Sequence, residues 1–426
     1  MHTLTYFTLK KNIRIGLVLF VFGTLLISCA DRNRENPLDP KNPATGGRPT
    51  GFTVLSKQDS VFLQWDAVKL TDIAGYRVFR KISNENDFSL VAVVDANENS
   101  FIDTNLTFEV TYQYQISVFG KDFESQRSDI VEITPGPTFY WVADNSKGEL
   151  VKLTHDAQHE MHRTANFFDI IDIGVNRATG DVWVVDFLNR FSSDIVKISS
   201  TGQFLLLVES IKAPISLAVN SVENSVWVAD SLKNEIVKLD SLGQVIFTNK
   251  ELSNPFTLAV DSKSGACWVA DDDENKVIRI GKDGANVFEL PHSFDLLRAM
   301  TFNSEEQSVW VVDNSALWKF NATGDLLFSV SLPDISFSKI AADEGTNDLW
   351  ALSRKNSKLV RFVASGAKQV EVSGFLNPRD LAVNFFNHSC MVADSDNDRL
   401  VKVNPNGQSV PVFHNLAFAD AVAIQN

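Results

Sequence analysis

The chain has 426 residues, and its contents of 44% hydrophobic and 22% charged residues are ordinary for a globular protein. Acidic residues number 53 against 39 basic ones, which gives a formal net charge of -14 at pH 7. Because nucleic acid requires a basic surface, this balance excludes a typical nucleic-acid-binding protein. The length is sufficient for two or three domains.

The first 28 residues are organised like an export signal. Lys10, Lys11 and Arg14 form a basic start, and residues 15–27 form an apolar segment that is short for a membrane span. The segment ends in Leu-Ile-Ser-Cys, with the cysteine at position 29. These four residues resemble the bacterial lipobox, which implies that Cys29 is lipidated and becomes the new N-terminus. An ordinary secretory signal or a single anchor helix is the alternative.

Residues 29–48 are expected to form a flexible tether, because they are rich in Pro, Asn and Gly and have no apolar period. A disordered N-terminus without a spacing role predicts the same sequence. With the export signal, the tether predicts a protein of the bacterial cell envelope. It would be anchored to a membrane by its N-terminal lipid and be periplasmic or surface-exposed.

Residues 49–136 are expected to form a small all-β sandwich. Several short segments, such as 112–118, alternate between apolar and polar residues as half-buried strands do. The segment resembles a fibronectin type III domain along its whole length. Trp65 matches the core tryptophan of the second strand, and Leu106 and Tyr112 match the tyrosine corner. The resemblance implies a spacer or an interaction module, and no chemistry is assigned to it.

Residues 139–426 contain a unit that recurs about every 40 residues, and short strands at that period are typical of a propeller blade. Each unit has an apolar run led by an aromatic residue, a polar turn and a second apolar run. The units align on Trp141, Trp183, Trp227, Trp268, Trp310, Trp350 and Met391. A further apolar strand lies upstream of each unit except the first.

The order of these strands predicts a closed ring. The unit at Trp141 lacks an upstream strand, and the last upstream-type strand, 420–424, has no unit after it. The two complete each other if the C-terminal strand closes onto the three N-terminal ones, which also hides sheet edges. We therefore predict a seven-bladed β-propeller. The units resemble NHL and YVTN-type repeats, and many NHL rings have six blades, so six blades is the alternative.

An aspartate follows the aromatic residue by three positions in most units. The residues are Asp144, Asp186, Asp230, Asp271, Asp313 and Asp394, with Ser353 as the exception. Near sevenfold repetition favours a structural role, in which each carboxylate accepts N–H groups of its own hairpin turn. Residues 394–398 look like the start of a calcium loop, but Arg399 stands where glycine is needed and Pro405 where glutamate is needed.

The histidines and cysteines do not predict a metal centre or a disulfide. His155, His159 and His162 are close in sequence, but 159 and 162 would point to opposite faces of a strand. Cys267 and Cys390 occupy equivalent positions three blades apart, too far for a disulfide bond. Both are expected to be small buried apolar residues. We predict no metal and no cofactor.

The residues that begin the upstream strands differ from unit to unit. Because inner strands line the channel of a propeller, these residues are expected to gather at one channel mouth. The predicted ligand-binding residues are Asp172, Arg298, Lys339, Arg379, Asp380 and Asp420, with Ser216 and Thr257 at equivalent positions. Acids and bases that converge on one axis are typical of a polar binding site. The alternative is a set of solvated charges that pair with each other.

These features predict a lipid-anchored extracytoplasmic binding or scaffold protein whose propeller recognises an envelope protein, a peptide or a glycan. The alternative is a lactonase-like hydrolase or lyase with its active site at the channel mouth. Such enzymes use a divalent metal or a histidine-centred group, whereas the predicted mouth positions hold no histidine and mix their acids with bases. We therefore predict a protein without enzymatic activity.

Overall fold

The structure, a computed structural model, describes residues 35–189, 191–285, 287–332 and 336–426. The expected signal peptide and the lipidation site Cys29 lie outside the described residues. Strands dominate the described chain, and its one helix is the short 3-10 helix η1 (Ser395–Asn397). Among these residues, no helix has the length and apolar content needed to span a membrane. The all-β fold class is therefore confirmed.

The chain divides into two compact units. Among the described residues, the first contains those up to Val54, Leu63–Ile102 and Tyr112–Glu132, and the second contains Leu55–Phe62, Asp103–Thr111 and Ile133–Asn426.

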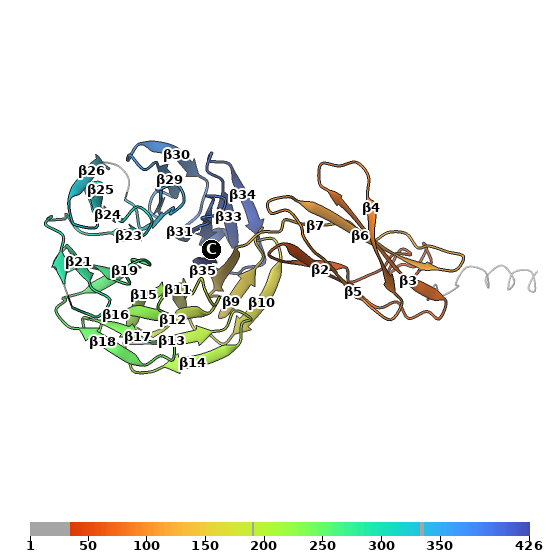
Figure 1. Cartoon of the computed structure of the whole chain (residues 1–426), viewed down its shortest axis with the longest axis horizontal. Helices are drawn as coiled ribbons and strands as arrows, with labels where there is room; N and C mark the ends of the chain where they lie inside the picture. The colour runs from red at the N-terminus through yellow and green to blue at the C-terminus, as the bar shows by residue number, and fades with distance from the viewer. Residues whose placement is uncertain (1–34, 190, 286, 333–335) are drawn as a thin grey trace, which may run out of the picture. The chain divides into compact units, whose positions relative to one another are not determined.

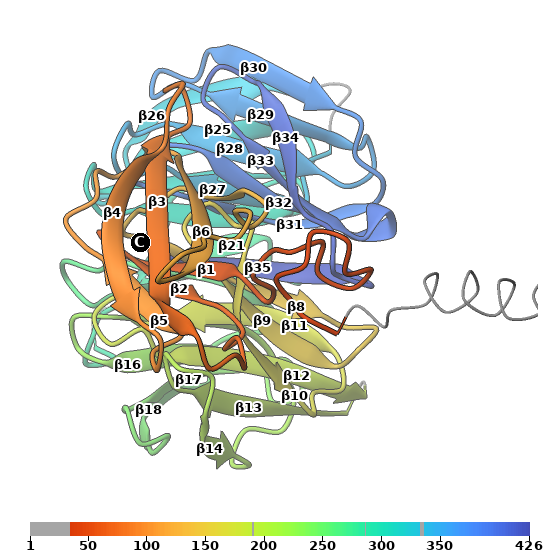
Figure 2. The same ribbon diagram turned by 90° about the vertical axis from the view of Figure 1, so that its right-hand side faces the viewer.

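Two antiparallel sheets account for the strands of the predicted sandwich. One has the order β1-β2-β5, with strands β1 (Thr53–Lys57), β2 (Ser60–Gln64) and β5 (Ser100–Asp103). The other has the order β4-β3-β6-β7, with strands β3 (Ile73–Ile82), β4 (Ser89–Asp95), β6 (Tyr112–Gly120) and β7 (Val131–Ile133). Figure 2 shows β3 and β4 side by side. Trp65, just after β2, is buried against Tyr76 of β3, with 5.1 Å between ring centroids, so this contact joins the two sheets.

The propeller is built from seven four-stranded antiparallel sheets among the described residues. Blade 1 has the order β10-β9-β8-β35, and blades 2 to 7 are β11–β14, β15–β18, β19–β22, β23–β26, β27–β30 and β31–β34. The inner strands contact one another in the closed order β35, β11, β15, β19, β23, β27, β31 and back to β35. In Figure 1 inner strands such as β11 and β19 surround the centre, and β14, β18 and β30 lie outside. Seven blades, rather than six, are therefore confirmed.

The four strand positions are occupied as follows. The inner strands are β11 (Ile170–Val175), β15 (Pro214–Asn220), β19 (Pro255–Val260), β23 (Ala299–Asn303), β27 (Lys339–Ala342), β31 (Pro378–Val383) and β35 (Ala419–Gln425). The second strands are β8 (Phe139–Asp144), β12 (Val182–Asn189), β16 (Ser225–Asp230), β20 (Cys267–Asp271), β24 (Ser308–Val312), β28 (Leu349–Ser353) and β32 (Cys390–Asp394).

The outer half of each blade follows the same order. The third strands are β9 (Glu149–Leu153), β13 (Ser192–Ile198), β17 (Glu235–Leu239), β21 (Lys276–Ile280), β25 (Ala316–Asn321), β29 (Lys358–Phe362) and β33 (Arg399–Val403). The fourth strands are β10 (Glu160–Ala165), β14 (Phe204–Val208), β18 (Val245–Asn249), β22 (Phe288–Glu289), β26 (Leu326–Ser331), β30 (Lys368–Ser373) and β34 (Ser409–Phe413).

The predicted closure by the C-terminal strand is confirmed. β35 pairs antiparallel with β8, with Val422 opposite Val142 and Ile424 opposite Tyr140. The chain end thus supplies the inner strand that blade 1 lacks, and it removes the open edge that β8 would otherwise present.

One apolar cluster lies between each pair of neighbouring blades. In six of the seven clusters the recurrent tryptophan of one blade packs against the next blade, as Trp227 does against Cys267 and Val269. At the remaining contact, between blades 7 and 1, Met391 packs beside Tyr140. The aromatic residue recurs in the sequence because each copy fills the apolar core between two neighbouring blades.

A buried cation opposite the tryptophan joins each of five blades to the next. Lys238 of blade 3 lies 5.1 Å from the Trp227 ring centroid, and its Nζ donates to the backbone carbonyl of Lys282 in blade 4 at 2.9 Å. Lys152, Lys197, Lys319 and Arg361 make the equivalent bond. Burial lowers the pKa of Lys152 to about 8. Burial thus opposes the charge, and it is the hydrogen bond to the next blade through which the cation of the repeat pattern links the ring.

The recurrent aspartates act within their own blades. Asp230 accepts the N–H groups of Leu232 and Lys233 in its own turn, as predicted, and also that of Lys212 in the loop before β15. A bond to that loop recurs for Asp144, Asp186, Asp271, Asp313 and Asp394. The structural role is confirmed, but among the described residues the predicted bond to the N–H groups of the turn is found only for Asp230, Asp271 and Asp313. The bond to the loop that leads into the inner strand is found for all six aspartates.

Candidate functional site: the two mouths of the channel

The seven inner strands run in one direction along the channel, so their ends form two rings of side chains. We call the end where the inner strands begin the N-mouth. It contains the six predicted residues Asp172, Arg298, Lys339, Arg379, Asp380 and Asp420. We call the end that follows the inner strands the C-mouth. It contains Arg177, Ser221, Ser262, Ser304, Glu344, Phe385 and Asn426.

The structure brings all six predicted residues together at the N-mouth. A cavity of about 300 Å³ is lined by Asp172, Arg298, Lys339 and Asp380, together with Ser216 and Thr257. A smaller cavity of about 190 Å³ adds Arg379 and Asp420 to Lys339 and Asp380. Their convergence is confirmed, and their role in binding remains a prediction.

β-Bulges mark the N-mouth positions in several inner strands. The register of the inner strand shifts between Ile170 and Asp172, between Pro214 and Ser216, between Pro255 and Thr257 and between Pro378 and Asp380. A bulge turns the side chains beside it away from strict alternation. The bulges therefore explain why a residue at the start of a regular apolar strand reaches the channel.

Two of the N-mouth acids bond to the neighbouring blade. Asp172 accepts the backbone N–H of Leu217 at 2.8 Å, and Asp380 accepts that of Val422 at 3.0 Å. The inner strand is the channel-side edge of its sheet, so such N–H groups need another partner. These carboxylates therefore stabilise the ring as well as lining the cavity.

The N-mouth charges also pair with one another. Lys339 Nζ lies 3.8 Å from a carboxylate oxygen of Asp380, and Arg379 lies 3.1 Å from one of Asp420. Asp420 further accepts a hydrogen bond of 2.9 Å from the Asn145 side chain. The alternative predicted from the sequence was that these charges pair with each other. Such pairs are present in the same cavity.

The environment shifts the pKa values of the Lys339–Asp380 pair. Burial raises the pKa of Asp380 above its ordinary value, although Lys339 opposes this. The Asp380 carboxylate raises the pKa of Lys339. Arg298, in contrast, is exposed, and its guanidinium donates only to the side chain of Asn314 within the described residues, which leaves it accessible to a partner.

Sequence reasoning missed the C-mouth. In six of the seven blades its residue follows an Asn or Asp at the end of the inner strand, and several neighbouring members are joined. The N–H groups of Arg177 and Ser262 donate to the hydroxyls of Ser221 and Ser304, and that of Phe385 donates to Asn426 Oδ1. The available signal was a variable residue directly after a recurrent Asn or Asp.

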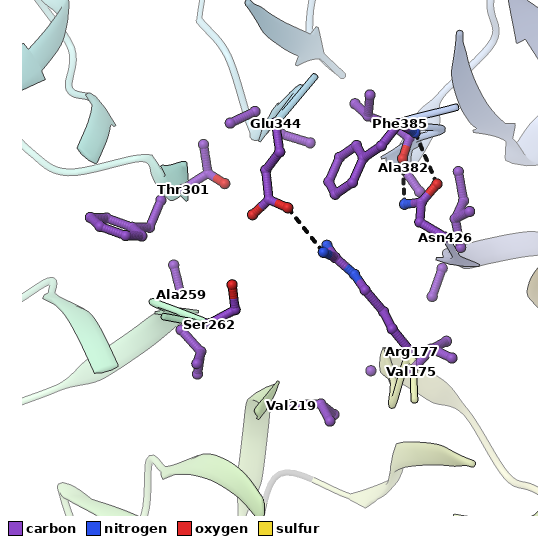
Figure 3. A pocket seen from close by; sticks show the side chains of 18 of the residues that line it. Val175, Arg177, Val219, Ala259, Ser262, Thr301, Glu344, Ala382, Phe385 and Asn426 are labelled. Carbon is purple, nitrogen blue, oxygen red and sulfur yellow. Dashed lines mark hydrogen bonds and ion pairs between the residues drawn. The ribbon is translucent and has the colours of Figure 1, made fainter. Parts of the chain in front are cut away.

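An ion pair crosses the C-mouth. Figure 3 shows Arg177 of blade 2 and Glu344 of blade 6 reaching toward each other across the cavity, and their Nη1 and Oε2 atoms are 2.9 Å apart. The guanidinium carbon of Arg177 lies 4.5 Å from the centre of the Phe385 ring, within cation–π range. The cavity has a volume of about 340 Å³. The C-mouth therefore brings together unlike charged, hydroxyl and aromatic groups from several blades.

The three histidines lie in different local structures. His155 is buried and contacts Thr138 Oγ1 at 2.5 Å, and His162 lies on β10. His159 precedes β10, so the strand alternation used to separate it from His162 was the wrong argument. Within the described ranges, no group of three or more His, Cys, Asp or Glu side chains is placed to hold a metal ion.

The remaining sequence candidates have structural contacts. Asp394 Oδ2 accepts hydrogen bonds from Asn397 at 2.9 Å and from Arg399 at 2.7 Å. The Arg399 guanidinium therefore lies where a calcium ion bound to this carboxylate would lie. Cys267 and Cys390 are buried and free, as expected, and burial raises the pKa of both thiols.

No family model matches the sequence. No curated protein matches it either. Solved structures are similar in backbone. A functionally unknown protein from Desulfotomaculum acetoxidans DSM 771 has a TM-score of 0.57 at 14% identity, over 67% of this chain and 98% of that one. A candidate 6-phosphogluconolactonase from Bacteroides uniformis ATCC 8492 has a TM-score of 0.56 at 12% identity, over 67% and 99%. Its counterpart from Bacteroides fragilis NCTC 9343 has a TM-score of 0.55 at 13% identity, over 67% and 97%. At these identities the likeness concerns the fold.

Proposed function

We propose that this chain is a lipid-anchored binding protein of the bacterial cell envelope whose propeller recognises a polar partner at the N-mouth. The partner is an envelope protein, a peptide or a glycan. The sequence features of the leader and Cys29 support the anchor, and the resemblance of residues 49–136 to fibronectin type III supports a spacer below an NHL-like propeller.

One observation carries the binding proposal. Six charged residues from the starts of five inner strands line adjoining cavities, and they are of both signs. Arg298 is exposed there and is free to contact a partner beyond its bond to Asn314. A partner with complementary polar groups would gain charge-assisted hydrogen bonds at this mouth.

The test uses the full chain, solubilised in detergent, to capture partners from envelope extract. We expect a saturable partner that binds at least tenfold more weakly to Arg298→Glu. The matched control is Lys282→Glu, a charge reversal at an exposed turn between a third and a fourth strand. Equal capture by both variants and by the unmodified chain would contradict a partner at the N-mouth.

The alternative function is a hydrolase or lyase of the lactonase type. Two backbone relatives are candidate 6-phosphogluconolactonases, and this likeness extends to the fold alone. We propose that the chain is not such an enzyme, because the N-mouth acids are engaged by backbone N–H groups and cations. Stoichiometric divalent metal in the purified protein together with turnover of a lactone would reverse this proposal.

A further inference from the structure

We propose that the C-mouth binds a small zwitterionic ligand, an α-amino acid with an apolar side chain. The Arg177–Glu344 pair would open to receive the ligand's carboxylate and ammonium groups. This site lies at the opposite end of the inner strands from the N-mouth, and it does not require the partner proposed there.

The ion pair at the C-mouth favours a ligand that carries both charges. Glu344 is 15% exposed and Arg177 is 40% exposed, and each satisfies the other. A simple anion on Arg177 would add a second negative charge beside the half-buried Glu344, and a simple cation on Glu344 would add a second positive charge beside Arg177. Like charges this close repel each other, so a ligand with a single charge is disfavoured. A ligand that carries both charges replaces the pair with two new ones, so the neutral pair selects for a zwitterion.

Several polar side chains at the C-mouth have hydrogen-bonding groups that are not used by other described residues. The Nε and Nη2 groups of Arg177 donate no hydrogen bond within the part of the chain that the structure describes, and its guanidinium is oriented by stacking on Phe385. A guanidinium so held offers a fork that matches a carboxylate. Ser262 and Thr301 also line the cavity, and their hydroxyls form no hydrogen bond among the described residues. Figure 3 shows both on the Glu344 side of the channel.

The C-mouth cavity also has an apolar wall next to the ion pair. The same cavity is lined by small apolar side chains of the inner strands. They include Val175, Val219, Val260, Ala342, Val383 and Ile424. A pocket with an apolar wall and a few convergent polar groups is suited to a small molecule. The head group would bind to the ion pair, and an aliphatic side chain would extend along this wall.

Isothermal titration of the detergent-solubilised full chain with L-leucine tests the proposal. L-Leucine should bind, while N-acetyl-L-leucine and L-leucinamide, which each lack one charge, should bind at least tenfold more weakly. Arg177→Ala and Glu344→Ala should each weaken L-leucine binding at least tenfold. Lys355→Ala, in the exposed turn between β28 and β29, is the control and should leave it unchanged.

The outcomes separate clearly because thermal unfolding of each variant shows whether the ring is intact. Equal affinity for L-leucine and N-acetyl-L-leucine would contradict the requirement for a ligand with both charges. Full binding of L-leucine by a folded Arg177→Ala variant would contradict binding at the C-mouth. Absence of binding by L-leucine, L-valine and L-alanine alike would overturn the ligand class.

Discussion

The two mouths use opposite ends of the same inner strands, yet their charged residues have different roles. At the N-mouth, Asp172 and Asp380 accept backbone N–H groups of the next blade at 2.8 and 3.0 Å. At the C-mouth, the turn is held by the preceding Asn or Asp, as Asn220 accepts the N–H groups of Val222 and Glu223. The residue after it is therefore less constrained.

This difference separates stability from recognition. Glu344 accepts only a long backbone bond of 3.4 Å from Ser304, and its short contact is with Arg177. A charge whose main partner is a partly exposed side chain can exchange that partner for a ligand at modest cost. A charge that satisfies a backbone N–H group cannot do so without leaving that group unpaired.

Deleting residues 420–426 should have the largest effect, because it removes the strand that closes the ring together with one residue of each mouth. The deletion takes away most of β35, including the buried Val422 and Ile424. Loss of these side chains and of the pairing with β8 should destabilise the ring by about 5 kcal/mol or more. The measurement is thermal unfolding, and removal of Asn426 alone serves as the control. Unchanged unfolding of the longer deletion would refute closure by β35.

Single substitutions should distinguish the mouths. Asp380→Ala should destabilise the chain by about 1–3 kcal/mol, because the Val422 N–H group loses its acceptor. Glu344→Ala should change stability by at most about 0.5 kcal/mol, since its partner Arg177 is 40% exposed. Urea unfolding midpoints measure both. If Glu344→Ala proves as costly as Asp380→Ala, the C-mouth pair is structural and the contrast between the mouths fails.

The smallest expected effect is an alkaline one at the N-mouth. Asp380 raises the pKa of Lys339 above its ordinary value of 10.5, so the folded state holds this proton more tightly than the unfolded state. The resulting stability is fully present below pH 10.5 and is lost as pH rises through the raised pKa. Because the side chain is 46% exposed, the contribution should stay below about 1 kcal/mol.

The check is the difference in unfolding free energy between the unmodified chain and Lys339→Gln, measured on both sides of pH 10.5. The difference should shrink at the higher pH. A difference that is constant with pH would show that the charge of Lys339 does not contribute to the stability of the N-mouth.

Much of the fold was accessible from sequence because repetition reports the local environment many times. Trp227 and its equivalents pack against the next blade in nearly every unit, so the period, the number of blades and the position of the core are all visible in the spacing. The incomplete first unit also determined that residues 420–424 close the ring. The gathering of Asp172 and Asp380 followed from their shared place in the repeat.

Only the tertiary structure decided which unlike residues meet. The bulge before Asp380 and its bond to Val422 depend on backbone geometry that the repeat does not encode. Arg177 and Glu344 are 167 residues apart in the chain and belong to blades that are not neighbours. The physical reason is that periodicity specifies what every blade has in common, whereas the C-mouth is made of what the blades do not share, and ring closure alone brings those side chains across the channel from one another.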